Sequence, residues 1–428
     1  MFRILKKEFA HFKSFPRNMR ILLMTNLIYA LVLPIIELFV GAYILRESDN
    51  TSYVVVYQLM VYFGIPVSFL INGILLRRIK IAWLYSLGML LSGVAMSIMM
   101  LLPSVDITGI SISGFVMGIS FGFFWSNRDF LSLSTTNDTN RNYYFSMETF
   151  FYTITFIIVP AIAGYFIVSG ERFGWYPAKA AYVTLTAVVF GLTVFSSIMV
   201  HQGNFVNPKN DRFIFFKFEK DWYWMLLLGA FKGIAQAAIF FFPILLILSF
   251  VGEEGSLGGL VAIGSLITAL VLYLIGRFSK PEHRIYIFSF GLLVFLAGGL
   301  VNTIFFSAIG VVIYQICNSL SRPLLDASYF PIQLGVIDHI AEIENRNKFA
   351  YIFNHEAGLF AGRFAGCMLF LLTAKYASPE FALRYVLLAI AAIQALSIPV
   401  AQMLIKKIQN YKKQKDIHAG AVPESIVV

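Results

Sequence analysis

Charge and cysteine are both scarce in this 428-residue chain, and each shortage excludes a class of protein. Asp, Glu, Lys and Arg make up only 13% of the residues, whereas hydrophobic residues make up 58% and the mean hydropathy is +0.76. That composition is far too apolar for a soluble domain. The two cysteines, Cys317 and Cys367, both lie in apolar segments, so the sequence has no disulfide framework.

Polar sequence between the apolar runs is also short. The longest internal polar stretch, 201–221, is too small to form a domain that hydrolyses ATP. The sequence contains no metal-ligand spacing, no Gly-rich phosphate loop and no nucleophile elbow. We therefore expect neither an enzyme nor a bound metal or cofactor. A membrane receptor or assembly partner that does not transport is disfavoured too, because it would need a larger loop or tail for signalling.

Apolar runs long enough to cross a bilayer, which takes about 20 residues, recur throughout the chain. They predict an all-α integral membrane protein with twelve transmembrane helices. The runs are 19–45, 53–76, 81–102, 109–135, 143–168, 178–200, 222–250, 256–276, 285–307, 310–336, 348–373 and 381–405.

The distribution of Lys and Arg predicts the orientation of these spans. Of the 33 basic residues, 24 lie in the tails and loops on one side, five lie on the other side, and four lie inside apolar runs. Basic loops stay in the cytoplasm, so both termini are predicted to be cytoplasmic and the protein to lie in the plasma membrane, which would be the inner membrane of a bacterium. The same loops account for the net charge of +10, so nucleic acid is not an expected partner.

The polar stretch 201–221 divides the chain into two pseudo-symmetric halves of six helices. We assign 1–200 to the first half, with a basic tail at 1–18, and 222–405 to the second, with a basic tail at 406–428. The first tail is either an interfacial amphipathic helix or a plain cytoplasmic extension. Features recur half a chain apart, since Pro34 corresponds to Pro243 and Arg141 to Arg346. Weak internal symmetry of this kind is typical of secondary transporters.

Six plus six helices, a basic central loop and basic loops after helices 2 and 8 resemble the major facilitator superfamily. That family has a signature of Gly, three residues and Asp-Arg in its 2–3 loop. Gly73 and Arg78 match it here, but Arg77 stands in place of the Asp. In the 8–9 loop Gly276 and Arg284 match, while Lys280 and Pro281 depart. The resemblance implies a central cavity lined by helices 1, 4, 7 and 10 and an inner gate that differs from the family pattern.

Nine ionisable residues lie inside the apolar runs, where each costs roughly 2.5–3.5 kcal/mol on insertion scales. Five are acids and four are bases, so mutual pairing is expected. They are Glu37, Arg128, Asp129, Glu148, Lys232, Arg322, Asp326, Glu356 and Arg363.

The bases on cavity-lining helices are candidates for substrate binding. Arg128, Lys232 and Arg322 could contact an anionic solute, because a guanidinium presents a fork of donors to carboxylate or phosphate. The alternative is that these bases only form structural ion pairs. Arg128 would pair with Asp129, Lys232 with an acid on helix 1, 4 or 10, and Arg322 with Asp326, which lies four residues away on the same helix face. Further polar and aromatic candidates, whose alternative role is packing, are Tyr29, Trp125, Gln236, Tyr314 and Asn318.

The acids divide between proton coupling and gating. Glu37 lies beyond Pro34 in helix 1, where a low-dielectric site would let a carboxylate bind and release protons; the alternative is a pair with Arg363. Asp129 and Asp326 are assigned to proton coupling as well. The residues assigned to gates, for which structural pairing is the competing reading, are Glu148, Glu356, Arg363, Arg77 and Arg78.

These patterns together predict a secondary active transporter of a small anionic or zwitterionic organic solute. We expect it to work as a monomer in the lipid bilayer, to alternate access and to couple to H+. The alternative is an exporter of amphipathic drugs or lipid-like molecules, in which Glu37, Asp129 and Trp125 would hold a lipophilic cation.

Overall fold

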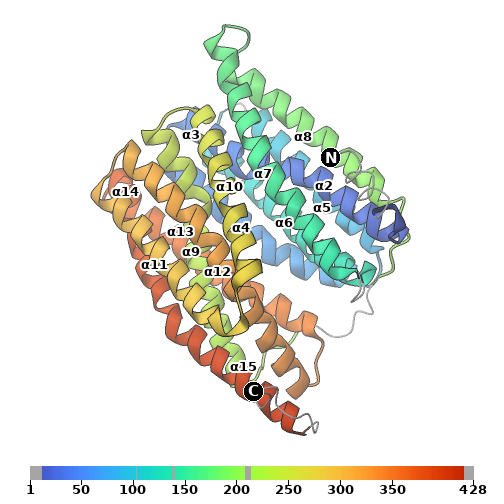
Figure 1. Cartoon of the computed structure of the whole chain (residues 1–428). Coiled ribbons are helices and arrows are strands. Elements are labelled where there is room, and N and C mark those ends of the chain that lie inside the picture. The colour runs from blue at the N-terminus through green and yellow to red at the C-terminus, as the bar shows by residue number, and fades with distance from the viewer. Residues whose placement is uncertain (1–11, 103, 137–139, 208–213, 419–428) are drawn as a thin grey trace. The chain divides into compact units, whose positions relative to one another are not determined.

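The computed structural model describes residues 12–102, 104–136, 140–207 and 214–418, and the described chain is helical apart from its turns and short connecting segments (Figure 1). The helices are α2 (Arg17–Pro34), η1 (Ile35–Phe39), α3 (Val40–Ser48), α4 (Thr51–Leu75), α5 (Ile81–Leu101), α6 (Ile107–Thr135), α7 (Arg141–Arg172), α8 (Ala178–Val200), α9 (Lys220–Phe250), α10 (Glu254–Phe278), η2 (Pro281–His283), α11 (Arg284–Ile304), α12 (Ala308–Ile343), α13 (Lys348–Tyr376), α14 (Pro379–Ala395) and α15 (Ser397–His418).

Each of the twelve predicted runs lies on one of these helices or on a continuous series of them. Eleven helical segments of the described chain are long and apolar enough to cross a membrane. The remaining run lies on the 36-residue helix α12, which is more polar and carries Arg322 and Asp326. The all-helical membrane fold predicted from the sequence is therefore confirmed.

Short polar caps separate the spans. Asn50 accepts a hydrogen bond from the Ser52 amide at 3.0 Å and starts α4, and Asp106 accepts one from the Gly109 amide at 3.1 Å and starts α6. Such side chains satisfy amide groups that the first turn of a helix leaves unpaired. Ser307 does the same for α12, at 3.5 Å from the Gly310 amide, so a loop of only three residues divides α11 from α12.

The chain folds into two compact units, and their borders do not follow the midpoint of the sequence. One unit comprises Met1–Asn210, Phe240–Leu266 and Ala374–Pro379, and the other comprises Asp211–Ile239, Ile267–Thr373 and Glu380–Val428. Helices α9 and α10 therefore each contribute one end to the first unit and the other end to the second.

Glycines bring helices of one unit into backbone contact. A Cβ atom on Gly118 of α6 would lie 2.1 Å from the carbonyl oxygen of Val61 on α4. In the second unit, a Cβ atom on Gly362 of α13 would lie 1.9 Å from the carbonyl oxygen of Ala230 on α9. Small residues allow such close approach, which drives helix association in lipid, where apolar packing alone gives little advantage.

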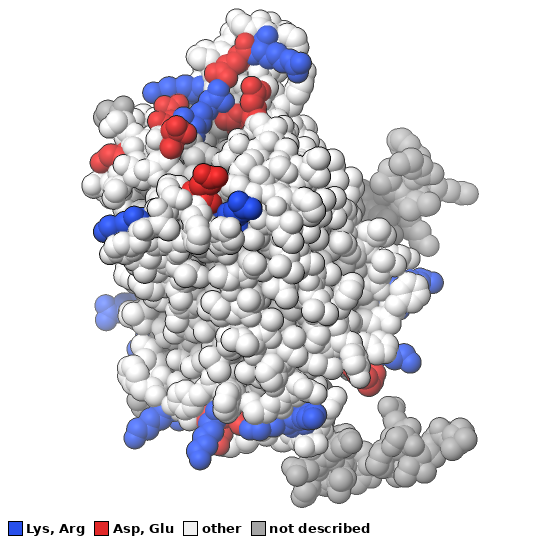
Figure 2. All heavy atoms as spheres, turned by 90° about the vertical axis from the view of Figure 1, so that its left-hand side faces the viewer, with Lys and Arg blue, Asp and Glu red and all other residues white. Residues whose placement is uncertain are grey.

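Charged side chains gather near the upper and lower ends of the face drawn in Figure 2, with a mostly uncharged band between them. Many large apolar side chains are also exposed to the surroundings, among them Trp83 at 60% and Leu101 at 81%. Exposed apolar surface of this extent marks contact with another apolar phase. A lipid-facing surface accounts for it.

Gly362→Val should destabilise the second unit, because backbone atoms cannot move aside for the new side chain. Overpacking typically costs about 1–3 kcal/mol. We expect a lower melting temperature of the purified protein in detergent. Gly259→Val on α10 is the matched control, since a Cβ atom there meets nothing within 4 Å. Equal melting temperatures for the two variants would contradict the close contact between α9 and α13.

Candidate functional site

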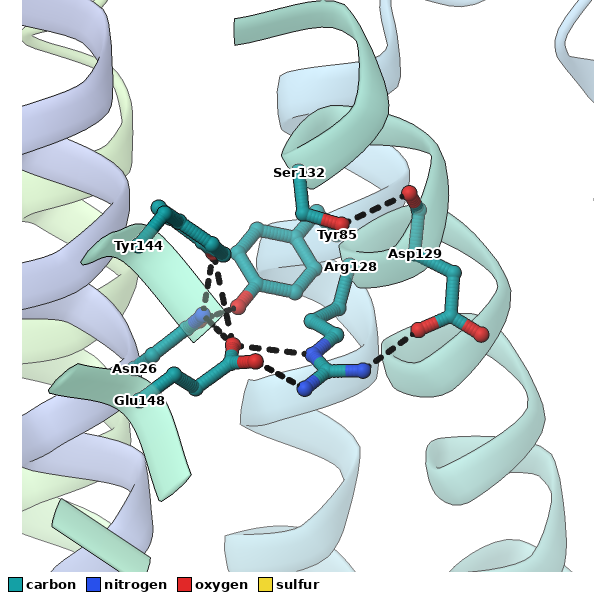
Figure 3. A network of polar contacts seen from close by, with 7 residues as sticks. All are labelled: Asn26, Tyr85, Arg128, Asp129, Ser132, Tyr144 and Glu148. Atoms are coloured by element: carbon teal, nitrogen blue, oxygen red, sulfur yellow. Dashed lines mark hydrogen bonds and ion pairs between the residues drawn. The ribbon is translucent and has the colours of Figure 1, made fainter. Parts of the chain in front are cut away.

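A buried network in the first unit is centred on the Arg128 guanidinium of α6 (Figure 3). The guanidinium lies between two carboxylates: Nε donates to Glu148 Oε1 at 2.9 Å, Nη2 also contacts Glu148, and Nη1 donates to Asp129 Oδ1 at 2.6 Å. Two donors on one carboxylate give the bidentate geometry that makes such pairs strong.

Side chains from α2, α5 and its own helix α7 hold Glu148 in place. Asn26 of α2 donates to Glu148 Oε1 at 2.5 Å and to the Tyr144 hydroxyl at 3.0 Å, and it accepts a hydrogen bond from Tyr85 of α5 (Figure 3). Tyr144, one turn before Glu148 on α7, donates to the same carboxylate oxygen at 3.3 Å. Asn26, Tyr144 and Arg128 all donate hydrogen bonds to this carboxylate, which stabilises a buried negative charge.

The two acids on Arg128 differ sharply in their exposure. Only 1% of the Glu148 side chain is exposed, whereas 57% of the Asp129 side chain is exposed. Adjacent residues on a helix point about 100° apart, so the Arg128 and Asp129 side chains leave α6 in different directions. The long Arg128 side chain instead curves back to Asp129 and reaches Glu148 as well. The pair with Asp129 is confirmed as one of the sequence-based alternatives, and the pair with Glu148 was missed.

The second unit contains an ion pair between Lys232 of α9 and Asp326 of α12. The Lys232 Nζ atom donates to Asp326 Oδ1 at 2.8 Å. It also lies 4.1 Å from the ring centre of Tyr329 and 4.0 Å from that of Phe330. Two aromatic faces and one carboxylate therefore surround the ammonium, and each of them attracts its positive charge. Only 11% of the Lys232 side chain is exposed, against 38% of the Asp326 side chain.

A second polar group of the same unit lies on α13. Arg363 Nε donates to Gln236 Oε1 of α9 at 3.0 Å, and its Nη1 donates to Glu356 Oε2 at 3.2 Å. His355, beside Glu356, is buried between the Tyr329 hydroxyl, 2.5 Å from Nε2, and Gln333, 3.2 Å from Nδ1. The structure thereby assembles α9, α12 and α13 around one polar interior.

Helix α12 also carries buried polar atoms that have no hydrogen-bond partner among the described residues. They are the Tyr314 hydroxyl, Gln315 Oε1 and Asn318 Oδ1, on side chains that are at most 6% exposed. Buried polar atoms are rarely left without a partner, so each one calls for an explanation such as a ligand or an ordered water. Arg322 follows one turn after Asn318 and is exposed.

The other predicted residues are distributed along the first unit. Glu37 is half-buried in the π-helical turn η1, directly after Pro34. Such turns are rare and occur frequently at functional sites. Tyr29 is fully buried and packs on Phe124, with ring centres 4.0 Å apart. Trp125 lies 5.4 Å from the Arg128 guanidinium and so borders the network around Arg128.

The loop after α4 is held by Asn207, a residue that no sequence pattern selects. Asn207, in the segment after α8, donates to the carbonyl oxygens of Leu76 at 2.8 Å and Ile79 at 2.7 Å and accepts from the Ile81 amide at 2.8 Å. This one amide therefore caps both the end of α4 and the start of α5. Arg77 and Arg78, predicted to act at a gate, are exposed on this loop.

A charged cluster at the opposite end of the first span was also missed. Arg46 of α3 donates to both carboxylate oxygens of Glu254, the first residue of α10, at 3.0 and 2.9 Å, and it contacts Glu171 of α7. Residues 46 and 254 are so far apart in the sequence that no spacing rule connects them. Across the described residues, no group of His, Cys, Asp and Glu could hold a metal ion.

Comparisons with known proteins agree with this architecture. No family model matches the sequence. The chain is 21% identical over 394 residues to the uncharacterized protein YqgE of Bacillus subtilis (strain 168), covering 90% of this chain and 89% of that one. It is 26% identical over 156 residues to an uncharacterized protein in the sodM 3'region of Geobacillus stearothermophilus, covering 36% of this chain and 72% of that one.

Solved structures show the fold. The nucleoside transporter NupG matches with a TM-score of 0.65 at 10% identity, covering 91% of this chain and all of that one. A structure of proton-dependent oligopeptide transporters matches with a TM-score of 0.67 at 12% identity, covering 92% and 99%. A bacterial homolog of the human lysosomal transporter Spinster matches with a TM-score of 0.63 at 11% identity, covering 92% and 98%. The chain is a multi-pass membrane protein with the fold of the major facilitator superfamily.

Glu148→Gln should destabilise the protein far more than Asp129→Asn, although both changes remove an acid from the same arginine. Breaking a buried pair costs about 3–5 kcal/mol, whereas an exposed pair contributes about 0–1 kcal/mol. Melting temperatures of the purified variants in detergent give the comparison. If Asp129→Asn lowered the melting temperature as much as Glu148→Gln, burial would not be what makes the Glu148 pair strong.

Proposed function

We propose that the chain is a secondary active transporter that carries a small anionic or zwitterionic organic solute across the plasma membrane together with protons. The fold it shares with transporters supports the general class. Opposed charges within membrane-spanning helices support a charged or zwitterionic substrate, because such residues are costly in lipid and mark substrate or ion pathways. Movement would follow alternating access between the two halves of the chain.

The observation that carries this proposal is the unequal exposure of Lys232 and Asp326. Lys232 is shielded by two rings and by the Asp326 carboxylate, so an anionic solute must displace that carboxylate to reach it. Protonation of Asp326 would remove its negative charge and its hold on the ammonium. A proton on Asp326 and an anionic group on Lys232 would then enter the site together, which couples the two fluxes.

The rest of α12 supplies groups for the neutral part of the substrate. Gln315, Asn318 and Tyr314 hold buried polar atoms that a solute with hydroxyl or amide groups would satisfy. Arg322, between Asn318 and Asp326 on the same helix, adds a second positive charge. Arg128 and Gln236, with the aromatic rings of Tyr29 and Trp125, extend the proposed set of binding residues, and Glu37 and Asp129 join Asp326 as candidate proton carriers.

Gating is proposed for the remaining charges of the two units. Glu148, Glu356 and Arg363 form pairs within one unit, and Arg77 and Arg78 are exposed on the loop that Asn207 caps. The cytoplasmic position of both termini and a monomeric state in the bilayer belong to the same proposal.

One observation favours the second candidate function, export of amphipathic compounds. In each unit one acid is more exposed than its basic partner: Asp129 at 57% against Arg128 at 17%, and Asp326 at 38% against Lys232 at 11%. A lipophilic cation would meet these carboxylates before it met either base. The two proposals therefore differ in the charge of the transported compound.

Proteoliposomes containing a pH-sensitive dye should separate the two functions. We expect the luminal pH to respond when amino acids, dicarboxylates, dipeptides or nucleosides are added in turn, with at least one anionic or zwitterionic solute giving a signal. Asp326→Asn should abolish this proton movement while it retains exchange of labelled solute. Lys232→Met should lower exchange about tenfold or more, because truncating one partner of a buried charge pair weakens binding strongly.

Asp338→Asn is the matched control on the same helix. Asp338 also pairs with a lysine, Lys348, but both side chains are more than 60% exposed, so this variant should behave as the parent protein. A signal obtained only with a lipophilic cation such as ethidium would replace the first proposal with the exporter. Full proton coupling in Asp326→Asn would remove Asp326 from the mechanism.

A further inference from the structure

The ends of α9 and α10 that belong to the first unit form a hairpin, Phe240–Leu266, whose chain continues at both ends into the second unit. Helix α10 packs here on α7 without room for side chains. A Cβ atom on Gly164 would lie 2.3 Å from the Glu254 carbonyl oxygen, and one on Gly258 would lie 2.0 Å from the Pro160 carbonyl oxygen. The hairpin is therefore seated closely on helices of the first half of the sequence.

A charged cluster holds the start of α10 against these helices. The Glu254 side chain is only 3% exposed, and it accepts hydrogen bonds from Arg46 of α3 at 3.0 and 2.9 Å and from the Tyr182 hydroxyl of α8 at 2.8 Å. Arg46 uses its other terminal nitrogen to contact Glu171 at the end of α7. Side chains from α3 and α8 thus converge on Glu254 of α10, and α7 supplies a second carboxylate to Arg46.

The second carboxylate is the unusual part of this cluster. Glu171 is 45% exposed, so it is not needed to neutralise a buried charge. It does, however, lie on the same unit as Arg46 whatever happens to α10. If Glu254 leaves, Arg46 keeps a carboxylate partner and Glu254 gains water. Exchange of partners lowers the cost of opening, because leaving one partner buried and unpaired is what makes breaking such pairs expensive.

We propose that Arg46, Glu171 and Glu254 form a releasable lock on the α9–α10 hairpin, and that release of Glu254 is a required step of the transport cycle. The inference rests on the proposed alternating access, since only a cycle of that kind needs the hairpin to part from the first unit. The basic-residue distribution predicts that this end of the first span faces outside. Arg46 and Glu254 are positioning residues that control access from that side, and Glu171 is the resting partner of Arg46 in the open state.

The lock makes two carboxylate variants act in opposite directions. Glu254→Gln loses the charge that holds the hairpin, so the hairpin should separate from the rest of the first unit more often. Glu171→Gln removes the carboxylate that Arg46 would keep after Glu254 leaves. The hairpin should then stay in place more often. A role in packing alone would make both changes neutral or would make both loosen the hairpin.

Opening can be measured with a cysteine at Leu257, which is fully buried one turn after Glu254. The full-length protein would carry Cys317→Ser, Cys367→Ser and Leu257→Cys, and would be reacted with a membrane-impermeant maleimide added outside right-side-out vesicles. We expect Glu254→Gln to raise the labelling rate about tenfold or more, in keeping with the strength of hydrogen bonds to charged groups. Glu171→Gln should lower the rate below that of the parent.

Glu253→Gln is the matched control, because Glu253 is the adjacent acid in the sequence and is exposed. It should label like the parent. The double variant Arg46→Glu with Glu254→Arg should return the labelling rate towards the parent value, and this rescue is not expected if Glu254→Gln merely unfolds the protein.

Equal labelling of Glu254→Gln and Glu253→Gln would overturn the lock. Faster labelling in Glu171→Gln would overturn the exchange of partners. The labelling needs no substrate, so it tests the lock independently of the proposed transport. A response in labelling without any solute flux would leave the lock in place and reject transport, whereas solute flux with unchanged labelling would reject only the lock.

Discussion

A charge that lies within a membrane-spanning helix must find a partner, and this constraint organises the interior of both units. Arg128 contacts Glu148 and Asp129, Lys232 contacts Asp326, and Arg363 contacts Glu356. Each contact ties together turns or helices that the apolar pattern alone would leave free to rotate, since lipid and protein interior are equally apolar. Within each unit, the helix faces that carry these charges therefore lie toward one another. Apolar residues occupy the rest of the helix surface.

The paired acids are of two kinds, and both kinds occur in each unit. Glu148 is enclosed by donors and Glu356 is 17% exposed, so both are closed pairs. Asp129 and Asp326, at 57% and 38%, are open ones. A closed carboxylate is held by fixed donors, whereas an open one can reach water. The closed pairs thus suit the holding contacts of a gate, and the open pairs suit exchange of protons or solutes.

Most of the fold was predictable from the sequence, because a hydrophobic run of about 20 residues fixes the existence of a membrane helix. All twelve runs lie on helices, and Glu148 and Glu356 lie near the starts of α7 and α13. The arginine partners break that symmetry: Arg128 comes from α6, whereas Arg363 comes from α13 itself. Periodicity could not reveal this, because it does not say how far a flexible side chain reaches.

Contacts between distant segments were equally beyond the sequence. Nothing in the composition connects Asn207 with the loop at Leu76–Ile81, or Arg46 with Glu254. A single Asn or Glu forms no recognisable sequence pattern. Asn207 and Glu254 gain their roles only when folding brings backbone groups or a guanidinium within hydrogen-bond distance. The sequence predicted which charged residues lie within the membrane-spanning helices. Only the structure shows which of them form ion pairs with one another.

The border between the units in α9 has a physical origin that the sequence does contain. It falls between Ile239 and Phe240, and Pro243 follows three residues later. Proline has no amide hydrogen, so residue 243 cannot bond the carbonyl oxygen of Ile239, and its ring crowds that same carbonyl. The helix is weakest at this point. The missing bond lets α9 bend at this point. The ion pair between Arg46 and Glu254 lies at the opposite end of this arm of the hairpin, where it adds to the close backbone contacts with α7 that hold the hairpin in place.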